Sequence, residues 1–300
     1  MYMEMQERYN SINIYLREQF GRKTVKLSLD AGFTCPNRDG TLGYGGCAFC
    51  SSQGSGDMSS NIDDQIALLS EKWPDAAYIA YFQSYTNTYA PVETLRSKYY
   101  EALSDPRIQG IAIATRPDCL GPGILDLLDE INKEHFLWVE LGLQSIHTKT
   151  TELMGIGYDL ACYDKAVNEL KKRNIRVVSH IILGLPGETK DDMFATVKHV
   201  ADSGIFGLKL HLLNLVKSSR LYEMMPDYCS FESIDEYTDL VVDLLEIIPW
   251  DITIHRLTAD VPRSDLVSPS WSYRKRTILN EINRKMRIRE TYQGIKSKNN

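Results

Sequence analysis

Three cysteines in one loop are the residues of this sequence whose type and spacing could do chemistry. Eleven residues separate Cys35 from Cys47, and two separate Cys47 from Cys50. The residues between them are rich in Gly, Asn and Asp, which allow a backbone to wrap around a bound group with thiolates pointing inward. Three thiolates leave one coordination position open, and in an iron–sulfur cluster an outside ligand can take that position.

The cysteines alone leave other interpretations open. A zinc site usually has a fourth Cys or His close by. The sequence contains no second Cys-x-x-Cys pair, and the nearest histidine along the chain is His135. An iron–sulfur site, a zinc site and a chance grouping therefore all remain possible at this point.

The bulk composition is that of an ordinary globular protein. The 300 residues are 43% hydrophobic and 25% charged, and the first residues are polar and acidic. No apolar run reaches the length of a membrane span. We therefore expect a cytoplasmic protein with no membrane partner, in which reducing conditions disfavour a disulfide within the cysteine loop.

The cysteine loop must be positioned by the elements around it, and the chain alternates apolar strand patterns with helical patterns. Strands are expected over residues 25–30, 77–82, 111–114, 136–143, 175–183, 208–215 and 252–254. Helices are expected over residues 62–73, 92–103, 124–131, 158–173, 190–203 and 233–248, with flanking helices at 9–20 and 273–289.

Near-continuous apolar strands joined by helices predict a parallel sheet covered on both faces. The fold class is α/β, a partial (β/α)6-type TIM barrel with N- and C-terminal helical extensions. We expect residues 1–300 to form a single domain, with the barrel core at about 10–260 and a basic helical extension at about 263–300.

Candidate site residues, most of them polar, lie within or just after the expected strands, where barrel enzymes place their chemistry. In chain order they are Gln83, Tyr85, Thr86, Asn87, Glu140, Gln144, His180, Gly184, Leu185, His211, Lys217 and Arg256. Each has a structural alternative, such as a loop, a turn or a core histidine. A carboxylate in an apolar strand is costly to bury without a partner, which favours a functional role for Glu140.

Five sequence blocks are familiar as a set. They are Asp-Gly-x-x-Gly-x-Gly-Gly-Cys-x-Phe-Cys at residues 39–50, Gln-x-Tyr-Thr-Asn-Thr-Tyr at 83–89, Thr-Arg-Pro-Asp at 115–118, Glu-Leu-Gly-Leu-Gln-Ser at 140–145 and the block at 180–188. Over about residues 10–292 the chain resembles the radical S-adenosylmethionine (radical SAM) superfamily. Within it, the chain resembles the YtqA/YhcC family, which is related to the radical SAM half of Elongator subunit 3.

The resemblance implies cofactors and their ligands. Cys35, Cys47 and Cys50 would hold a [4Fe–4S] cluster as metal ligands and catalytic residues, with S-adenosyl-L-methionine on the fourth iron. Binding of that cofactor is expected from nine residues: Gln83, Tyr85, Thr86, Asn87, Glu140, Gln144, His180, Gly184 and Leu185. Lys217 is expected to act beside His211 and Arg256 on substrate phosphates or a carboxylate, with structural ion pairs as the alternative.

The resemblance also implies a function. Reduced by a flavodoxin- or ferredoxin-type electron donor, the enzyme would cleave S-adenosylmethionine to a 5′-deoxyadenosyl radical that abstracts hydrogen from substrate. The expected substrate is tRNA, at the C5 side chain of a wobble uridine such as carboxymethylaminomethyluridine. The alternatives are a radical SAM enzyme acting on a small molecule or protein, and a non-enzymatic zinc-stabilised RNA-binding protein.

The charge distribution is compatible with RNA. Ten Lys/Arg and three Asp/Glu give residues 263–300 a net charge of +7, and the chain's total of −6 leaves −13 on the rest. A basic end on an acidic body favours a polyanionic partner, with a solvated helix as the alternative. One departure from the family pattern, Gly155-Ile-Gly-Tyr-Asp159, bears on substrate choice, and Cys119, Cys162 and Cys229 have no metal-ligand pattern.

Overall fold

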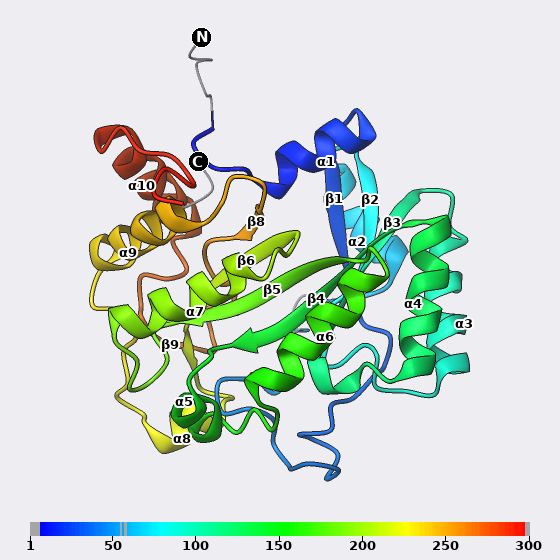
Figure 1. Cartoon of the computed structure of the whole chain (residues 1–300), viewed down its shortest axis with the longest axis horizontal. Coiled ribbons are helices and arrows are strands. Elements are labelled where there is room, and N and C mark those ends of the chain that lie inside the picture. The colour runs from blue at the N-terminus through cyan, green and yellow to red at the C-terminus, as the bar shows by residue number, and fades with distance from the viewer. Residues whose placement is uncertain (1–6, 55, 57–58, 298–300) are drawn as a thin grey trace.

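A curled sheet of seven parallel strands forms the centre of the protein (Figure 1). The computed structural model describes residues 7–54, 56 and 59–297. The strands lie side by side in the order β1(Thr24–Leu29), β2(Ala77–Phe82), β3(Ile108–Thr115), β4(Phe136–Gln144), β5(Arg176–Leu183), β6(Gly207–Leu212) and β8(Thr253–Arg256). The predicted partial barrel is confirmed, because every neighbouring pair in this sheet is parallel.

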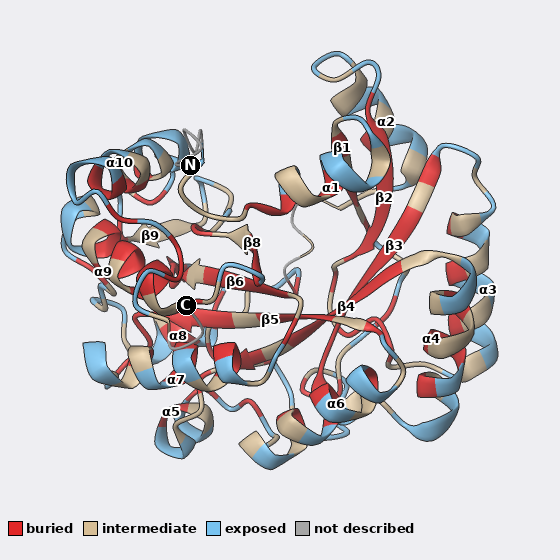
Figure 2. Cartoon of the chain, turned by 45° about the horizontal axis from the view of Figure 1, so that its top comes forward, coloured by how far each residue is buried: buried red, intermediate tan, exposed pale blue. Residues whose placement is uncertain are grey.

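Helices cover the outer face of the curled sheet (Figure 1). They are α2(Ile62–Ser70), α3(Val92–Leu103), α4(Pro122–Glu134), α6(Leu160–Lys172), α7(Lys190–Asp202), α9(Ile234–Ile247) and α10(Lys275–Ile288). Their amphipathic patterns explain this arrangement, since each turns its apolar side to the core and its polar side to solvent, with α10 packed on α9. Figure 2 shows the result, with buried residues on the strands and the inward sides of the helices.

The strands are apolar on both faces because helices cover one face and the barrel interior holds the other. All six residues of β2 are buried. The interior begins as a layer of apolar side chains from several strands, including Ile79, Ala112 and Trp138. Farther along the strands the interior becomes polar, at Glu140 and Lys209. The polar part of the interior is therefore toward the carboxyl ends of the strands.

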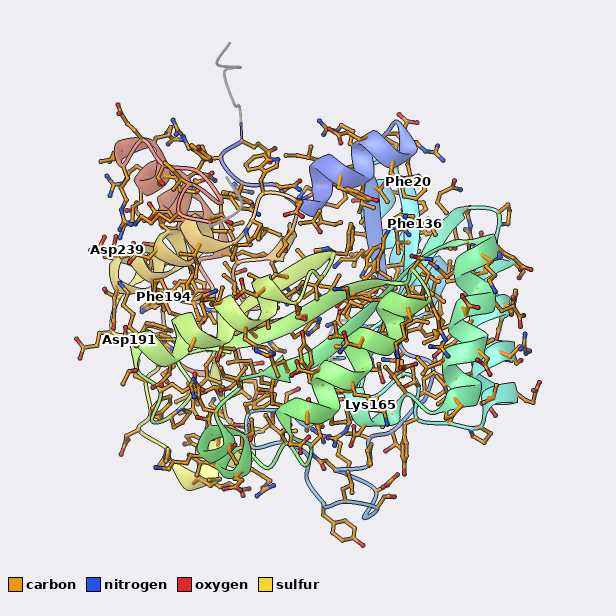
Figure 3. All side chains as sticks on the ribbon, viewed as in Figure 1. Phe20, Phe136, Lys165, Asp191, Phe194 and Asp239 are labelled. Atoms are coloured by element: carbon orange, nitrogen blue, oxygen red, sulfur yellow. The ribbon has the colours of Figure 1, made fainter. Side chains whose placement is uncertain are left out.

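The N-terminal helix α1(Ile12–Phe20) packs against the apolar part of the interior. Its buried residues Ile12 and Leu16 join the cluster that contains Trp138. Figure 3 shows Phe20 beside Phe136 of β4, and their rings meet edge to face with centroids 5.2 Å apart. The helix contacts both edge strands, β1 and β8, so it covers the place where a complete barrel would have further strands.

One predicted strand is divided in the structure. The sequence pattern predicts a strand over residues 208–215, but β6 ends at Leu212 and a separate strand, β7(Leu215–Val216), pairs antiparallel with β9(Leu266–Ser268). The chain turns away between them at Leu213. The backbone N–H of Leu213 donates to Leu183 O at the end of β5, and its carbonyl accepts a hydrogen bond from Ser230 Oγ. This small second sheet brings residues 266–268 next to the mouth of the barrel.

Three short helical elements complete the described structure: η1(Pro117–Cys119), α5(Thr148–Leu153) and α8(Arg220–Met224). They lie in segments that the sequence pattern leaves as loops. Among the residues described here, none of the helices is long and apolar enough to cross a membrane.

Candidate functional site

A cavity of about 590 Å³ lies at the carboxyl ends of the strands. Nine of the predicted site residues line it: Cys35, Cys47, Cys50, Gln83, Tyr85, Thr86, Glu140, Gln144 and His180. His211 and Arg256 line it as well. Side chains that are more than two hundred positions apart in the sequence therefore share one space, with the three thiols on its wall.

The cysteine loop is held in shape by a buried amide side chain. Asn37, 5% exposed, donates through Nδ2 to Cys47 Sγ at 3.3 Å and to the carbonyl oxygens of Gly155 and Ile156 at 2.9 and 3.0 Å. The backbone N–H of Ala48 donates to Met154 at 2.8 Å. The segment that departs from the family pattern thus forms the support of the cysteine loop through backbone groups, which any side chain can supply.

A guanidinium group lies against the cysteines from the other side. Arg38 donates to the carbonyl oxygen of Ser52 at 3.2 Å, and its guanidinium carbon lies 5.4 Å from the centre of the Tyr85 ring. Burial lowers the pKa of Arg38, but the neighbouring Cys50 sulfur raises it further, so the group stays charged. A fixed positive charge beside the thiols favours their ionised, ligand-competent form.

The donor set fits an iron–sulfur cluster. Burial raises the pKa of the Cys47 thiol to about 12, so a metal centre would displace its proton on binding. Within the described residues, no group of three Cys, His, Asp or Glu surrounds a single metal ion. A [4Fe–4S] cluster has one thiolate on each iron it ligates, which spreads its ligands farther apart than those of one ion.

Two predicted site residues have a backbone conformation that residues other than glycine rarely adopt. Tyr85 has φ 60° and Gln144 has φ 69°, both in the left-handed region. Conformations of this kind cost free energy and cluster at binding sites. Both residues line the cavity.

The floor of the cavity is a buried polar network around Glu140. This carboxylate is 0% exposed and accepts hydrogen bonds from Tyr81 Oη at 2.7 Å, Trp138 Nε1 at 2.9 Å and His180 Nε2 at 2.7 Å. Lys209 Nζ donates to the same carboxylate and, at 2.8 Å, to Tyr81 Oη. A buried charge with this many donors is satisfied without a ligand.

The electrostatics of the floor follow from this network. Burial raises the pKa of Glu140, but Lys209, Lys26 and His180 lower it further, so it lies well below its usual value and the carboxylate is ionised. Burial, aided by the charge of Lys209, lowers the pKa of His180 to about 4. His180 is therefore neutral near pH 7 and donates its Nε2 proton to Glu140.

Some polar atoms on the β6 side of the cavity have no protein partner. Within the described part of the chain, His211 Nε2 and both amide atoms of Asn214 are buried and make no hydrogen bond. Asn214 is 7% exposed and lines the cavity. Buried polar atoms are normally satisfied, so unpaired ones that face a cavity indicate a place for a ligand.

Four predicted site residues lie elsewhere than on the cavity lining. Asn87 is buried and donates to Ala114 O at 2.9 Å behind the wall. Gly184 turns the chain after β5 with its carbonyl bonded to Tyr228, and Leu185 is in an apolar cluster. Lys217 extends along the surface, where its Nζ donates to Ser264 O at 3.1 Å. Their parts in the predicted chemistry stay predictions.

Sequence reasoning missed several residues that shape the site. Tyr81 and Lys26 read as ordinary strand residues, yet both reach Glu140, Lys26 at 3.8 Å. Asn37 and Arg38 are within the cysteine loop, but their contacts depend on segments far away in the sequence. One signal was available: lysine and tyrosine on the inward positions of strands that are otherwise apolar.

Comparison with known proteins agrees with this site. Residues 35–200, which contain the three cysteines, Tyr81, Glu140 and His180, match the Radical SAM superfamily, and residues 205–288 match the Radical_SAM C-terminal domain. The chain is 46% identical to YtqA of Bacillus subtilis over 98% of its own length and 94% of that protein. It is 36% identical to YhcC of Escherichia coli, with 94% and 93% covered.

The chain is also similar to more distant proteins. The chain is 24% identical to the tRNA uridine(34) acetyltransferase of Methanocaldococcus jannaschii over 55% of this chain and 30% of that protein. The fold is similar to the solved archaeal Elp3 of Methanocaldococcus infernus, with a TM-score of 0.65 at 16% identity, over 90% of this chain and 64% of that one. With three thiols on one cavity wall and a family match across the same residues, the chain belongs to the radical SAM superfamily, in the family of YtqA and YhcC.

Proposed function

We propose that this radical SAM enzyme modifies tRNA, at the C5 side chain of a wobble uridine. The main support for the radical chemistry is that three thiols, a guanidinium group and unpaired buried polar atoms lie around one cavity. The cavity is large enough for a cofactor and part of a substrate, since ligand sites are commonly about 300–1,000 Å³.

The residues that line the cavity suggest how the cofactors are held. Cys35, Cys47 and Cys50 would ligate a [4Fe–4S] cluster, and Gln83, Tyr85 and Thr86 line the same cavity within reach of S-adenosylmethionine. When bound and reduced by a flavodoxin- or ferredoxin-type donor, the pair supplies a carbon radical that removes hydrogen from substrate. A reactive species of this kind requires a site from which water is excluded.

The chain's own residues provide that environment. Asn37 and Arg38 fix the cysteine loop from two sides. The network of Glu140, Tyr81 and Lys209 closes the bottom of the cavity with side chains whose hydrogen bonds are all made within the protein. A rigid, satisfied floor holds bound groups in one orientation, which is how a site positions reacting atoms.

Two observations support tRNA as the substrate. The chain is 24% identical to a tRNA uridine(34) acetyltransferase over 55% of its own length and 30% of that protein. The C-terminal residues 263–300 carry a net charge of +7 on an acidic protein, as expected for contact with a polyanion. We propose remodelling of a carboxymethylaminomethyl-type substituent as the specific reaction.

The test of the radical chemistry is anaerobic. Wild-type protein is reconstituted with iron and sulfide, reduced and given S-adenosylmethionine, and 5′-deoxyadenosine is measured with and without tRNA. Cys47→Ala is expected to abolish the product and the visible absorbance of the cluster. Cys229→Ala, an exposed cysteine, is the matched control and should retain both. A colourless wild-type protein that holds zinc instead of iron would contradict the proposal.

The substrate is tested separately. Mass spectrometry of tRNA nucleosides from a deletion strain should show altered wobble uridines, which purified enzyme converts in vitro. Unchanged wobble uridines, together with an active cluster, would reject tRNA modification and favour a small-molecule or protein substrate for the same radical chemistry.

A further inference from the structure

The basic C-terminal end divides into two kinds of cation. On α10, Lys285 is 6% exposed and contacts Asp235 and Asp239 of α9 at 2.7 and 2.9 Å. Arg289 contacts Asp243 at 2.7 Å as well as Asp239, which Figure 3 labels on α9. These cations hold α10 on α9, so they are not available to bind an outside polyanion.

Other arginines of this end are not used in this way, and two of them lie close together. Arg263 and Arg274 form no ion pair within the residues that the structure describes, and both lie beside Tyr273. The guanidinium carbon of Arg263 is 4.4 Å from the centre of the Tyr273 ring, and that of Arg274 is 5.7 Å away. Arg274 Nε also donates to Tyr273 Oη at 3.3 Å. The two positive charges therefore flank one aromatic ring.

This arrangement lines a hollow of about 390 Å³, which we call the arginine–tyrosine groove. Its lining residues are Arg263, Leu266, Val267, Ser270, Trp271, Tyr273 and Arg274. Tyr273 is 43% exposed, which is high for a large aromatic residue. The Trp271 Nε1 proton is buried without a partner in the described chain. The groove thus offers aromatic surface and two guanidinium groups.

The chemistry of the groove suits a single-stranded nucleic acid. Exposed aromatic rings stack on unpaired bases, and arginines bind the phosphates on either side. A base in a duplex is already stacked and cannot use the ring of Tyr273. A simple anion would need the arginines but not the aromatic surface, so the combination favours a nucleotide in an unpaired segment.

The groove adjoins the mouth of the main cavity. Ala259, Asp260 and Val261 line that cavity, and Arg263, two residues after Val261, lines the groove. The Cα atoms of Val261 and Arg263 are at most about 7 Å apart, since a residue spans no more than about 3.6 Å. Asp260 joins the two regions, contacting Arg256 at 3.2 Å and Lys275 of α10 at 2.8 Å.

We propose that the arginine–tyrosine groove binds a nucleotide that neighbours the target nucleotide in a single-stranded RNA segment, while the target enters the main cavity. The proposal rests on RNA being the substrate, as proposed above. It assigns the RNA contact to Arg263, Trp271, Tyr273 and Arg274, and it excludes the paired cations of α10 from that role.

The test is direct binding of fluorescent RNA, measured by anisotropy with the reconstituted full chain. The probes are an anticodon stem-loop and an unstructured oligonucleotide. Tyr273→Ala should weaken binding by about 5- to 100-fold, the effect of one lost base stack. R263Q/R274Q should also reduce the slope of log K against log salt by about 1.4, because each phosphate contact on a single strand contributes about 0.7.

Matched variants control for charge and folding. Arg284→Gln removes the same charge from α10 but at a residue paired with Glu281, and Tyr292→Ala removes an aromatic residue that is 37% exposed outside the groove. Both should bind RNA like wild type. Iron content and circular dichroism of every variant report whether the protein is intact.

The outcomes are distinguishable. If wild type binds no RNA, the proposed substrate class is wrong and the groove has no RNA to bind. If wild type binds but the groove variants bind as tightly as the controls, the groove proposal is overturned while the substrate class stands. If duplex RNA competes as well as the single-stranded probe, the assignment to an unpaired segment is wrong.

Discussion

The ionised carboxylate of Glu140 is the residue on which the interior of the barrel depends. It is fully buried, and its donors come from four strands: Tyr81 from β2, Trp138 from its own strand β4, His180 from β5 and Lys209 from β6. Because a buried charge is stable only while its partners remain, each member of the network constrains the others. The network therefore couples the register of several strands to the shape of the cavity.

Glu140→Gln should strongly destabilise the protein, because it leaves Lys209 buried beside a neutral amide. The expected loss is about 3–5 kcal/mol of unfolding free energy, typical of a broken buried pair. Urea unfolding at pH 7.5 measures it. Glu93→Gln makes the same chemical change on a side chain that is 86% exposed and should alter stability by less than about 0.5 kcal/mol. Equal effects for the two variants would show that the network contributes little.

Asn37→Ala should loosen the cysteine loop without unfolding the protein. It removes the hydrogen bonds to Cys47 Sγ, Gly155 O and Ile156 O, at a cost of about 1–3 kcal/mol, while Ile156 O keeps its hydrogen bond from Arg116. We expect lower iron content after reconstitution than in wild type. Asn283→Ala, whose amide donates only to Leu279 O on α10, is the control. Full iron loading of Asn37→Ala would show that the loop is positioned in another way.

At the scale of elements, α1 and the loop after β1 have separate tasks. The helix α1 covers the apolar end of the interior, and the loop carries the cysteines at the opposite, polar end. Parallel strands make this division possible, since all their carboxyl ends meet at one rim. The capping box at the start of α7, formed by Thr189 and Asp192, similarly fixes where the chain leaves the turn after β5.

Leu16→Ala should destabilise the protein through a cavity between α1 and the sheet. Leu16 is 2% exposed and belongs to the cluster that contains Trp138, so the expected cost is about 2–5 kcal/mol. The same truncation at Leu68 of α2, which is 67% exposed, is the control and should cost far less. Chemical denaturation of both variants decides whether α1 is an integral part of the barrel.

At the scale of the whole molecule, acid sensitivity is built into the barrel interior. Burial lowers the pKa of His180 to about 4 and the pKa values of His211 and His255 well below their usual range. The charged groups that face them are Glu140, Lys209, Lys26 and Arg256. The histidines remain neutral in the folded protein at pH values where the unfolded chain has already protonated them.

The free energy of unfolding should therefore fall as pH is lowered below about 6.5, the usual pKa of histidine. Between that pH and about 4, unfolded His180 binds a proton that folded His180 does not, so its contribution to stability is present above this window and lost within it. Each such histidine contributes at most about 1.4 kcal/mol per pH unit. Urea unfolding at pH 7.5 and 5.5 measures the difference.

His180→Gln should make stability less dependent on pH than in wild type over the same range. His135→Gln, which lies outside the interior cluster, is the matched control and should leave the wild-type dependence unchanged. A pH dependence that is identical in wild type and both variants would contradict a role for the buried histidines.

The sequence by itself determined the kinds and order of the elements, because strand and helix periodicities are local properties. The cysteine spacing and the motif blocks likewise predicted the family, and Cys47, Cys50 and Glu140 from two of these blocks line the main cavity. The division of the strand predicted at 208–215 into β6 and β7 was not predictable, since it depends on Leu213 bonding to β5 and Ser230.

Only the tertiary structure decided which side chains meet. Tyr81, Glu140 and Lys209 come together because strand register and sheet curvature place them at one depth of the barrel, and neither property is encoded within a single strand. The same holds for charge. The sequence shows a basic C-terminal end, but pairing across α9 and α10 decides that Lys285 and Arg289 are neutralised while Arg263 and Arg274 remain beside Tyr273. Ion pairs between residues some fifty positions apart depend on packing, which local sequence patterns do not specify.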